Sequence, residues 1–237
     1  MSWLTKRPIA HRGLHADHCP ENSLSALEAA INEGYPVEVD VRLTRDGVPV
    51  LFHDRTLDRL TGMDGRLEQT TWRELERLRL LDSDQRVPSL AEVLTLVDGQ
   101  VPLLLELKTE TGPGPLESAV AAQLDAYDGS FAVQSFNPRT VAWFRQNRPA
   151  WTRGQLYGRR RPGLMEGLKG AVLDRLPTNL YSRPHFVGVH HESVTASPTS
   201  GDGSSDLPLL AWTVRTRTQL DRVAARVDNV IFEGIRP

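Results

Sequence analysis

Residues 40–53 read Asp-Val-Arg-Leu-Thr-Arg-Asp-Gly-Val-Pro-Val-Leu-Phe-His. The Asp46-Gly47 dipeptide lies between two alternating apolar runs, and this pattern is typical of a two-residue β-hairpin turn. Because so short a turn joins only antiparallel strands, the returning run cannot be the next strand of a parallel sheet. Pairing across the turn between residues 45 and 48 places Asp40 opposite His53. The stretch therefore predicts a hairpin that extends one strand of the sheet and brings His53 back to Asp40.

Around this hairpin, short apolar runs alternate with amphipathic stretches along the whole chain. Alternation of this kind is expected of βα units built on a parallel sheet. Eight core strands with interleaved helices predict a closed α/β structure, a single (β/α)8 barrel, with the hairpin as an extension after its second strand. The predicted strands are Pro8 to His11, Pro36 to Val41, Pro102 to Leu107, Phe131 to Ser135, Gly154 to Leu156, Phe186 to Val189, Leu209 to Val214 and Asn229 to Phe232.

The helices that should connect these strands carry recognisable boundaries. Apolar residues in the stretch from Ser23 to Glu33 recur at helical intervals, with Asn22 or Ser23 as the N-cap and Gly34 as a stop. The polar, turn-rich segment 193–207 predicts a loop where a barrel helix would be expected. The remaining predicted helices are Thr71 to Leu78, Leu90 to Val97, Pro115 to Tyr127, Pro138 to Asn147 and Thr216 to Ala225.

Length and composition place the chain among ordinary globular proteins. Its 237 residues are 39% hydrophobic and carry a net charge of -2, so we expect one domain over residues 1–237 and no nucleic-acid partner. The single cysteine, Cys19, cannot form an internal disulfide, which fits a reducing compartment. We find no signal-peptide or membrane-spanning pattern. These observations predict a cytoplasmic protein without stable membrane insertion, and they leave the oligomeric state open.

Ionisable residues gather at the ends of the predicted strands. The active-site face of a (β/α) barrel is formed by the carboxyl ends of its strands, where His11, Glu38, Asp40 and Glu106 fall. Any one of them is more often a cap or a solvated group, but a convergent set on apolar strands would be expensive to bury without a ligand. Three carboxylates repel one another unless they hold a cation. We therefore predict one divalent ion, Mg²⁺ or Ca²⁺, bound by Glu38, Asp40 and Glu106.

The remaining candidates suit phosphate chemistry. Two histidines, His11 and His53, flank the carboxylates and are suited to proton transfer near neutral pH. Arg12 follows His11, and Lys108 lies two residues after Glu106 on the same strand face, so both offer positive charge to a phosphate group. The residues therefore predict a metal site with two histidines for proton transfer and with positive charge for a phosphate.

Several ordered motifs resemble one family. Ile9-Ala-His-Arg-Gly13, Pro20-Glu-Asn-Ser23, Glu38-Val-Asp-Val41, the segment 46–54, Val87-Pro-Ser-Leu90 and Leu105-Glu-Leu-Lys108 look like glycerophosphodiester phosphodiesterases, most strongly over residues 7–108. The resemblance implies a TIM barrel with a divalent metal on Glu38, Asp40 and Glu106, and with His11 and His53 as acid and base.

That family hydrolyses glycerophosphodiesters to glycerol 3-phosphate and an alcohol. The alternatives are a lysophospholipase D-like phosphodiesterase and a barrel that binds phosphorylated metabolites without turnover. The residues do not decide which histidine is the base, whether water or a glycerol hydroxyl attacks the phosphorus, or which metal and which alcohol the site takes.

The second half of the chain follows the family less closely. Gln134-Ser-Phe-Asn137 and Trp212-Thr-Val214 resemble strands that line the far side of the family's pocket, and Trp212 is a candidate substrate-binding residue. Arg215 stands where family members usually carry Asn, and Phe232-Glu233 where they carry a Thr-Asp pair. Together with segment 193–207, these departures affect substrate choice more than reaction type.

Overall fold

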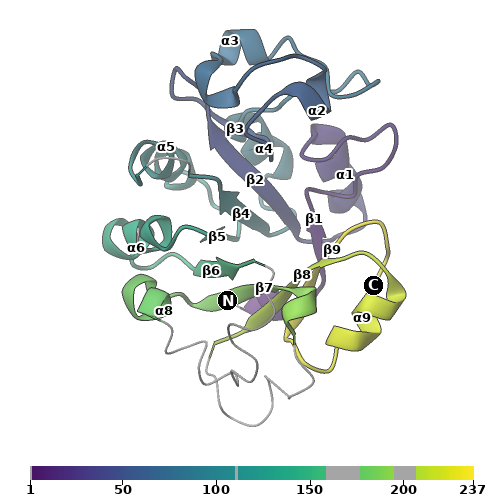
Figure 1. Cartoon of the computed structure of the whole chain (residues 1–237), viewed down its shortest axis with the longest axis vertical. Coiled ribbons are helices and arrows are strands. Elements are labelled where there is room, and N and C mark those ends of the chain that lie inside the picture. The colour runs from purple at the N-terminus through teal and green to yellow at the C-terminus, as the bar shows by residue number, and fades with distance from the viewer. Residues whose placement is uncertain (1, 110–111, 159–176, 195–206) are drawn as a thin grey trace. The chain divides into compact units, whose positions relative to one another are not determined.

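The computed structural model describes residues 2–109, 112–158, 177–194 and 207–237. Its strand order is β1-β9-β8-β7-β6-β5-β4-β2-β3, with an additional pairing of β1 and β2 (Figure 1). This is the topology of a closed eight-stranded parallel barrel in which β3 is bonded outside. The predicted TIM barrel with a hairpin after its second strand is therefore confirmed.

The chain divides into two compact units, Ala10–Phe131 and the combination of Met1–Ile9 with Ala132–Pro237. A single domain over the whole chain remains a prediction. Most of segment 193–207, where the sequence predicts a loop, lies outside the described residues. No helix among the described residues is both long and apolar enough to cross a membrane.

In the unit of residues 10–131, β2 is the central strand. It lies parallel to β1 through Val37 and Glu38, and parallel to β4 along its other edge. Val37, Val39 and Val41 are fully buried, while Glu38 and Asp40 alternate with them and point to the opposite face. The elements are β1 (Ile9–His11), α1 (Leu24–Asn32), β2 (Val37–Leu43), α4 (Leu90–Val97), β4 (Leu103–Leu107) and α5 (Pro115–Leu124), while η1 (Ser2–Thr5) belongs to the other unit.

The hairpin forms as predicted, but its register differs by one residue. Strand β3 (Pro49–Leu51) is antiparallel to the end of β2, with Leu43 opposite Pro49 and Phe52 N–H donating to the carbonyl of Asp40 (3.0 Å). The prediction that Asp40 faces His53 is therefore wrong. A slip of one residue reverses the face of every side chain, so the ladder itself does not bring His53 to Asp40.

The physical reason is a three-residue loop in place of the predicted two-residue turn. Thr44 pairs with Val48: the Thr44 N–H donates to the Val48 carbonyl (3.0 Å), and the Val48 N–H donates to the Thr44 hydroxyl oxygen (2.9 Å). The Asp46 carboxylate accepts from the Thr44 hydroxyl (2.7 Å) and from the amide of Trp72 (2.9 Å), and these bonds hold it in the loop. Gly47 then takes the left-handed conformation (φ 83°) with which such loops usually close.

A small hydrophobic core supports the segment between β3 and α4. Its side chains pack the hairpin against three short helices, and this contact anchors the segment to the β2–β3 hairpin. The helices are α2 (Asp58–Thr61), η2 (Leu67–Gln69) and α3 (Trp72–Leu75). The core consists of Val50, Phe52, Leu57, Leu60, Leu67, Leu75, Leu80 and Val87.

The second unit carries the five remaining barrel strands. From β6 to β9 each strand pairs in parallel with its predecessor along the chain. All eight predicted core strands are present, with boundaries within two residues of the prediction. The elements are β5 (Phe131–Ser135), α6 (Pro138–Asn147), β6 (Arg153–Tyr157), α8 (Pro177–Ser182), β7 (Phe186–His190), η3 (His191–Ser193), β8 (Leu209–Val214), α9 (Arg217–Val223) and β9 (Asn229–Phe232).

Two glycines with nearly identical φ angles should differ sharply in their tolerance of a side chain. Gly13 (φ 82°) and Gly47 (φ 83°) are both left-handed. A Cβ on Gly13 would lie 2.6 Å from the backbone of Ala26, whereas one on Gly47 meets nothing within 4 Å. We expect Gly47→Ala to lower the free energy of unfolding by about 1 kcal/mol, and Gly13→Ala by roughly 2 kcal/mol more. Equal losses in urea denaturation would contradict the packing described at Gly13.

Candidate active site

The three predicted carboxylates meet on one face of the sheet in the unit of residues 10–131. Asp40 on β2 stands in register with Glu106 on β4, and Glu38 precedes Asp40 by two residues on the same face. One oxygen from each lies within 4.8 Å of the others. All three residues are buried, and Asp40 has no exposed surface. The strand register thus produces a compact cluster of three acidic groups.

Arg12 and Lys108 provide the positive charge that this cluster requires. Lys108 Nζ lies 3.0 Å from Asp40 Oδ1 and 2.5 Å from Glu106 Oε1. Arg12 Nε lies 2.9 Å from Asp40 Oδ2, and the Arg12 amide donates to Glu38 Oε2 (3.2 Å). Both cationic side chains are themselves largely buried, at 14% exposure each. Their predicted place beside the carboxylates is therefore observed, although a role in phosphate binding stays a prediction.

Burial and charge act differently on the three carboxyl groups. Burial raises the pKa of Glu38, and the neighbouring Asp40 and Glu106 add to this effect. Burial also raises the pKa of Glu106, to about 7, against the opposing influence of Lys108. At Asp40, burial is outweighed by Lys108 and Arg12, which hold the pKa of its carboxyl well below the usual range. Asp40 is therefore the permanently ionised member of the cluster.

Asn22 is a site residue that the sequence reasoning did not assign. Its side-chain amide donates to Asp40 Oδ2 (2.9 Å), and its side-chain oxygen accepts from the Asp40 amide (3.2 Å). This double contact requires a left-handed backbone at Asn22 (φ 58°), a conformation that asparagine tolerates better than most residues. Ser23, rather than Asn22, caps α1 by accepting from Ala26 N–H (3.2 Å). In the sequence, the motif Pro20-Glu-Asn-Ser23 is the signal that could have identified Asn22 as a site residue.

His53 reaches the site by a different route from the predicted one. The chain leaves the ladder after β3, and the carbonyl of His53 accepts from Arg42 Nε (2.8 Å). The imidazole lies close enough to Asp40 for each to influence the pKa of the other. Burial nevertheless lowers the pKa of His53, which favours the neutral ring. His53 thus lies within electrostatic range of Asp40, while the strand pairing predicted for the two residues is wrong.

A chain of ion pairs connects His53 with Arg12. His53 Nδ1 lies 2.6 Å from Asp54 Oδ1, and Arg59 Nε donates to Asp54 Oδ2 (2.5 Å). Arg59 then binds both oxygens of Glu21 (2.8 Å each), and Glu21 accepts from Arg12 (2.6 Å). Three members, Glu21, Asp54 and Arg59, were not among the predicted site residues. Glu21 and Asp54 lie inside two of the recognised motifs, whereas Arg59 on α2 gave no signal because only the fold brings it here.

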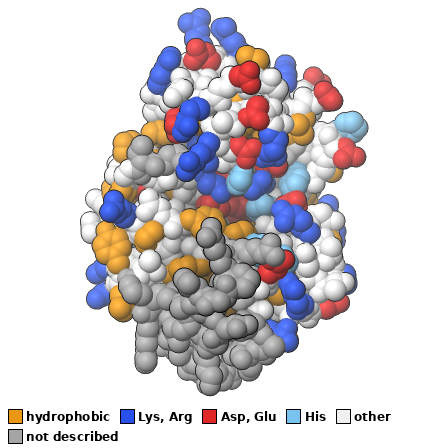
Figure 2. All heavy atoms as spheres, viewed as in Figure 1, with side chains coloured by type: hydrophobic (Ala, Val, Ile, Leu, Met, Phe, Trp, Pro, Cys, Tyr) orange, Lys and Arg blue, Asp and Glu red, His pale blue; other side chains and the backbone are white. Residues whose placement is uncertain are grey.

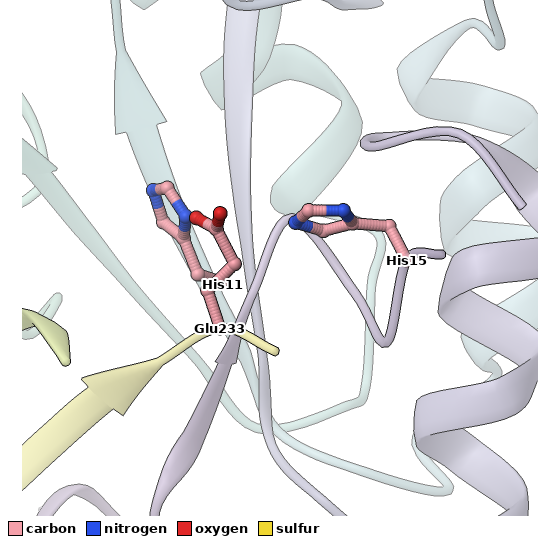
Figure 3. Close-up of side chains that lie close together, drawn as sticks. All are labelled: His11, His15 and Glu233. Carbon is pink, nitrogen blue, oxygen red and sulfur yellow. The ribbon is translucent and has the colours of Figure 1, made fainter. Parts of the chain in front are cut away.

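His11 ends β1 and lies in register with Glu38. Its Nε2 is 3.9 Å from Glu38 Oε2, which places the second predicted histidine at the carboxylates. Figure 3 shows His15, from the loop after β1, near His11, with a ring nitrogen of each within 4.8 Å of the other. The sequence reasoning left His15 out of the site. Glu233, also drawn in Figure 3, belongs to the other unit.

In that other unit, the residues that depart from the family pattern contact each other. Arg215 Nε and Nη2 donate to the two carboxylate oxygens of Glu233 (3.0 and 2.9 Å), so the two departures form one bidentate ion pair. Trp212 on β8 is half-buried and meets Phe136 edge-on, with ring centroids 5.4 Å apart. A role for Trp212 in substrate binding stays a prediction.

The carboxylate cluster fits a hard divalent cation. It offers three buried oxygen ligands, the kind that Mg²⁺ and Ca²⁺ prefer. Asp40 Oδ1 and Glu106 Oε1 are buried, and the Lys108 ammonium is a cationic neighbour of both, at 3.0 and 2.5 Å. Buried oxygens in this state favour a positively charged ligand. The cluster can therefore bind a metal ion.

Acidic groups and histidines gathered at strand ends of a (β/α)8 barrel are the arrangement of barrel enzymes. The model of the glycerophosphoryl diester phosphodiesterase family matches residues 11–235. A glycerophosphodiester phosphodiesterase of Caldanaerobacter subterraneus subsp. tengcongensis is 30% identical, over 95% of this chain and 93% of its own length.

Solved structures agree on the fold. The Oleispira antarctica phosphodiesterase has a TM-score of 0.81 at 24% identity and covers 97% of this chain and 93% of its own. The glycerophosphodiester phosphodiesterase of Thermotoga maritima has a TM-score of 0.71 at 23% identity, over 95% and 94%. The chain belongs to the glycerophosphoryl diester phosphodiesterase family. Its predicted assignment as a phosphoric diester hydrolase is confirmed.

The ion-pair chain yields a prediction about stability. Arg59 contacts both carboxylate oxygens of Glu21, and the Glu21 side chain is only 12% exposed. In the Arg86–Glu92 pair (2.6 Å), the Glu92 side chain is 31% exposed. In double-mutant cycles with Gln at each position, we expect a coupling of roughly 1 kcal/mol for Arg59–Glu21 and below about 0.5 kcal/mol for Arg86–Glu92. Equal couplings in urea denaturation would show that the network adds nothing beyond a surface pair.

Proposed function

We propose that the chain hydrolyses glycerophosphodiesters to glycerol 3-phosphate and an alcohol with the help of one divalent cation and two histidines. The observation that carries this proposal is the buried cluster of Glu38, Asp40 and Glu106, whose oxygens lie within 4.8 Å of one another. The Oleispira antarctica phosphodiesterase, which shares the fold, is described in complex with the product sn-glycerol-3-phosphate. That complex supports a small phosphodiester as the substrate here.

Glu38, Asp40 and Glu106 would hold the cation, and their oxygen ligands favour Mg²⁺ or Ca²⁺. When bound, such an ion supplies Lewis-acid stabilisation of charge on the phosphate oxygens. Arg12 contributes a positive charge next to the same carboxylates, 2.9 Å from Asp40. Lys108, 3.0 Å from Asp40, does the same from the other side. The phosphate group of the substrate would therefore bind next to these two side chains, beside the cluster.

His53 is the proposed general base. Asp54 Oδ1, 2.6 Å from Nδ1, accepts a hydrogen bond from the N–H at that nitrogen and leaves Nε2 free of a proton, as the acceptor. The lowered pKa of His53 keeps the ring neutral at neutral pH, as a base requires. Nε2 would take the proton of the attacking hydroxyl, whether this belongs to water or to a glycerol carbon.

His11 is the proposed general acid. It lies on β1 in register with Glu38, with its Nε2 3.9 Å from Glu38 Oε2, and would protonate the departing alkoxide. Asp54, held in turn by Arg59, positions His53 and does not itself contact the reacting atoms. The cytoplasmic location expected from the sequence remains a prediction.

The direct test measures release of glycerol 3-phosphate from glycerophosphocholine with and without added Mg²⁺ or Ca²⁺. We expect activity only with the metal, and a loss of at least about 100-fold in kcat for His11→Ala and for His53→Ala. His18→Ala, at an exposed histidine of the same unit, is the matched control and should retain full activity.

Undiminished activity in the double variant His11→Ala/His53→Ala would overturn the two-histidine assignment. Cleavage of lysophosphatidylcholine in place of glycerophosphocholine would support the lysophospholipase D-like alternative. Failure to cleave either diester, together with binding of phosphorylated metabolites, would support the barrel without turnover.

A further inference from the structure

We propose, on the basis of the phosphodiesterase function above, that Arg59 is a positioning residue that holds His53 and Arg12 in one fixed geometry. These two side chains are the proposed general base and a proposed ligand of the substrate phosphate. Arg59 reaches them through one carboxylate on each side, Asp54 and Glu21. The whole network belongs to one compact unit of the chain.

The packing of α2 determines where Arg59 points. Arg59 lies in this single-turn helix between Leu57 and Leu60, which are 3% and 2% exposed and belong to the small hydrophobic core of the hairpin segment. Gly62 ends the helix in the left-handed conformation (φ 66°), and its N–H donates to the carbonyl of Asp58 (2.8 Å). With both leucines buried, the Arg59 side chain turns outward and is 46% exposed. A side chain on a turn anchored in this way can hold other groups in place.

The guanidinium group of Arg59 binds two carboxylates at once. Nε donates to Asp54 Oδ2 (2.5 Å), while Nη1 and Nη2 donate to Glu21 Oε2 and Oε1 (2.8 Å each). Because the guanidinium is planar, its donors point in fixed directions, and the two carboxylates are held at a set angle to each other. A lysine ammonium would supply the same charge without imposing that angle.

Each carboxylate passes this constraint on to one functional side chain. Asp54 Oδ1 lies 2.6 Å from His53 Nδ1, so the carboxylate that binds Arg59 also orients the imidazole ring. Glu21 Oε1 accepts from Arg12 Nη1 (2.6 Å) and from Arg59 Nη2 (2.8 Å), so this one oxygen lies between two guanidinium groups. A change at Arg59 is therefore felt at both ends of the network.

The carboxylates of the network bind Arg59 as anions. Burial would raise the pKa of Glu21, but the hydrogen bond from Arg59 and the charge of Arg12 lower it. The pKa of Asp54 is likewise lowered, against burial, by Arg59 and His53. Both groups are thus ionised near neutral pH, and charges of opposite sign follow one another along the network. Figure 2 shows red acidic, blue basic and pale blue histidine side chains gathered together on this unit.

The test measures two properties of the folded protein that do not require turnover. One is the tautomer of the His53 ring, from the nitrogen NMR signals of its imidazole at about pH 8. The other is the Kd for sn-glycerol 3-phosphate by calorimetry with Mg²⁺ present. In the wild-type protein we expect the His53 proton to stay on Nδ1. In Arg59→Gln we expect a mixture of tautomers, binding weaker by about tenfold, and a kcat for glycerophosphocholine lower by at least about tenfold.

Two further variants separate positioning from charge and from stability. Arg59→Lys keeps the charge but not the planar fork, so it should recover part of the stability in urea denaturation without restoring the tautomer or the Kd. Arg86→Gln is the matched control: Arg86 is 43% exposed, close to the 46% of Arg59, and pairs with Glu92 (2.6 Å) outside the network. It should leave the tautomer, the Kd and kcat unchanged. A purely structural role for Arg59 would lower the free energy of unfolding and leave those three quantities unchanged as well.

The inference is overturned if either the tautomer or the Kd is unchanged in Arg59→Gln, or if Arg59→Lys restores both. The same measurements separate it from the proposed function. If the wild-type protein releases no glycerol 3-phosphate from glycerophosphocholine while both properties respond to Arg59→Gln, the proposed function fails and the role of Arg59 stands. If the diester is hydrolysed and neither property responds, the positioning role fails and the function stands.

Discussion

Three carboxylates are buried side by side in this protein, and an arrangement of like charges in a dry site is stable only with positive charge among them. Lys108 and Arg12 supply that charge at distances of 2.5 to 3.0 Å from Asp40 and Glu106. The two cations hold Asp40 ionised, while burial raises the pKa of Glu38 and Glu106. The surrounding structure places these five groups, the three carboxylates and the two cations, next to one another.

Strand β2 is the element on which this placement depends. Its first half pairs with β1 and β4 and aligns Glu38 and Asp40 with His11 and Glu106. Its second half carries the hairpin, whose small core holds the segment with Asp54 and Arg59 against the sheet. The ion pairs from Arg12 through Glu21 and Arg59 to Asp54 then fix the ring of His53. One strand thus organises both the carboxylate cluster and the histidine near it.

The sequence predicted most of the fold because alternation, capping residues and strand spacing are local signals. It also predicted which carboxylates meet, since residues two apart on a strand share a face. The hairpin register was wrong by one residue, because the Asp46 side chain bonds to Thr44 and to distant Trp72 and enlarges the turn. Arg59 and the contact of Asn22 with Asp40 were missed for a similar reason: both depend on contacts between segments far apart in the chain.

The central claim is that the buried cluster holds a divalent cation, and calorimetric titration of Ca²⁺ into the metal-free protein tests it most directly. Because burial raises the pKa of Glu106 to about 7, the cluster must release protons to bind the ion. We therefore expect affinity to increase from about pH 6 to about pH 8, and binding to be lost in Glu106→Gln. Calcium binding that is independent of pH and unchanged in that variant would contradict the account.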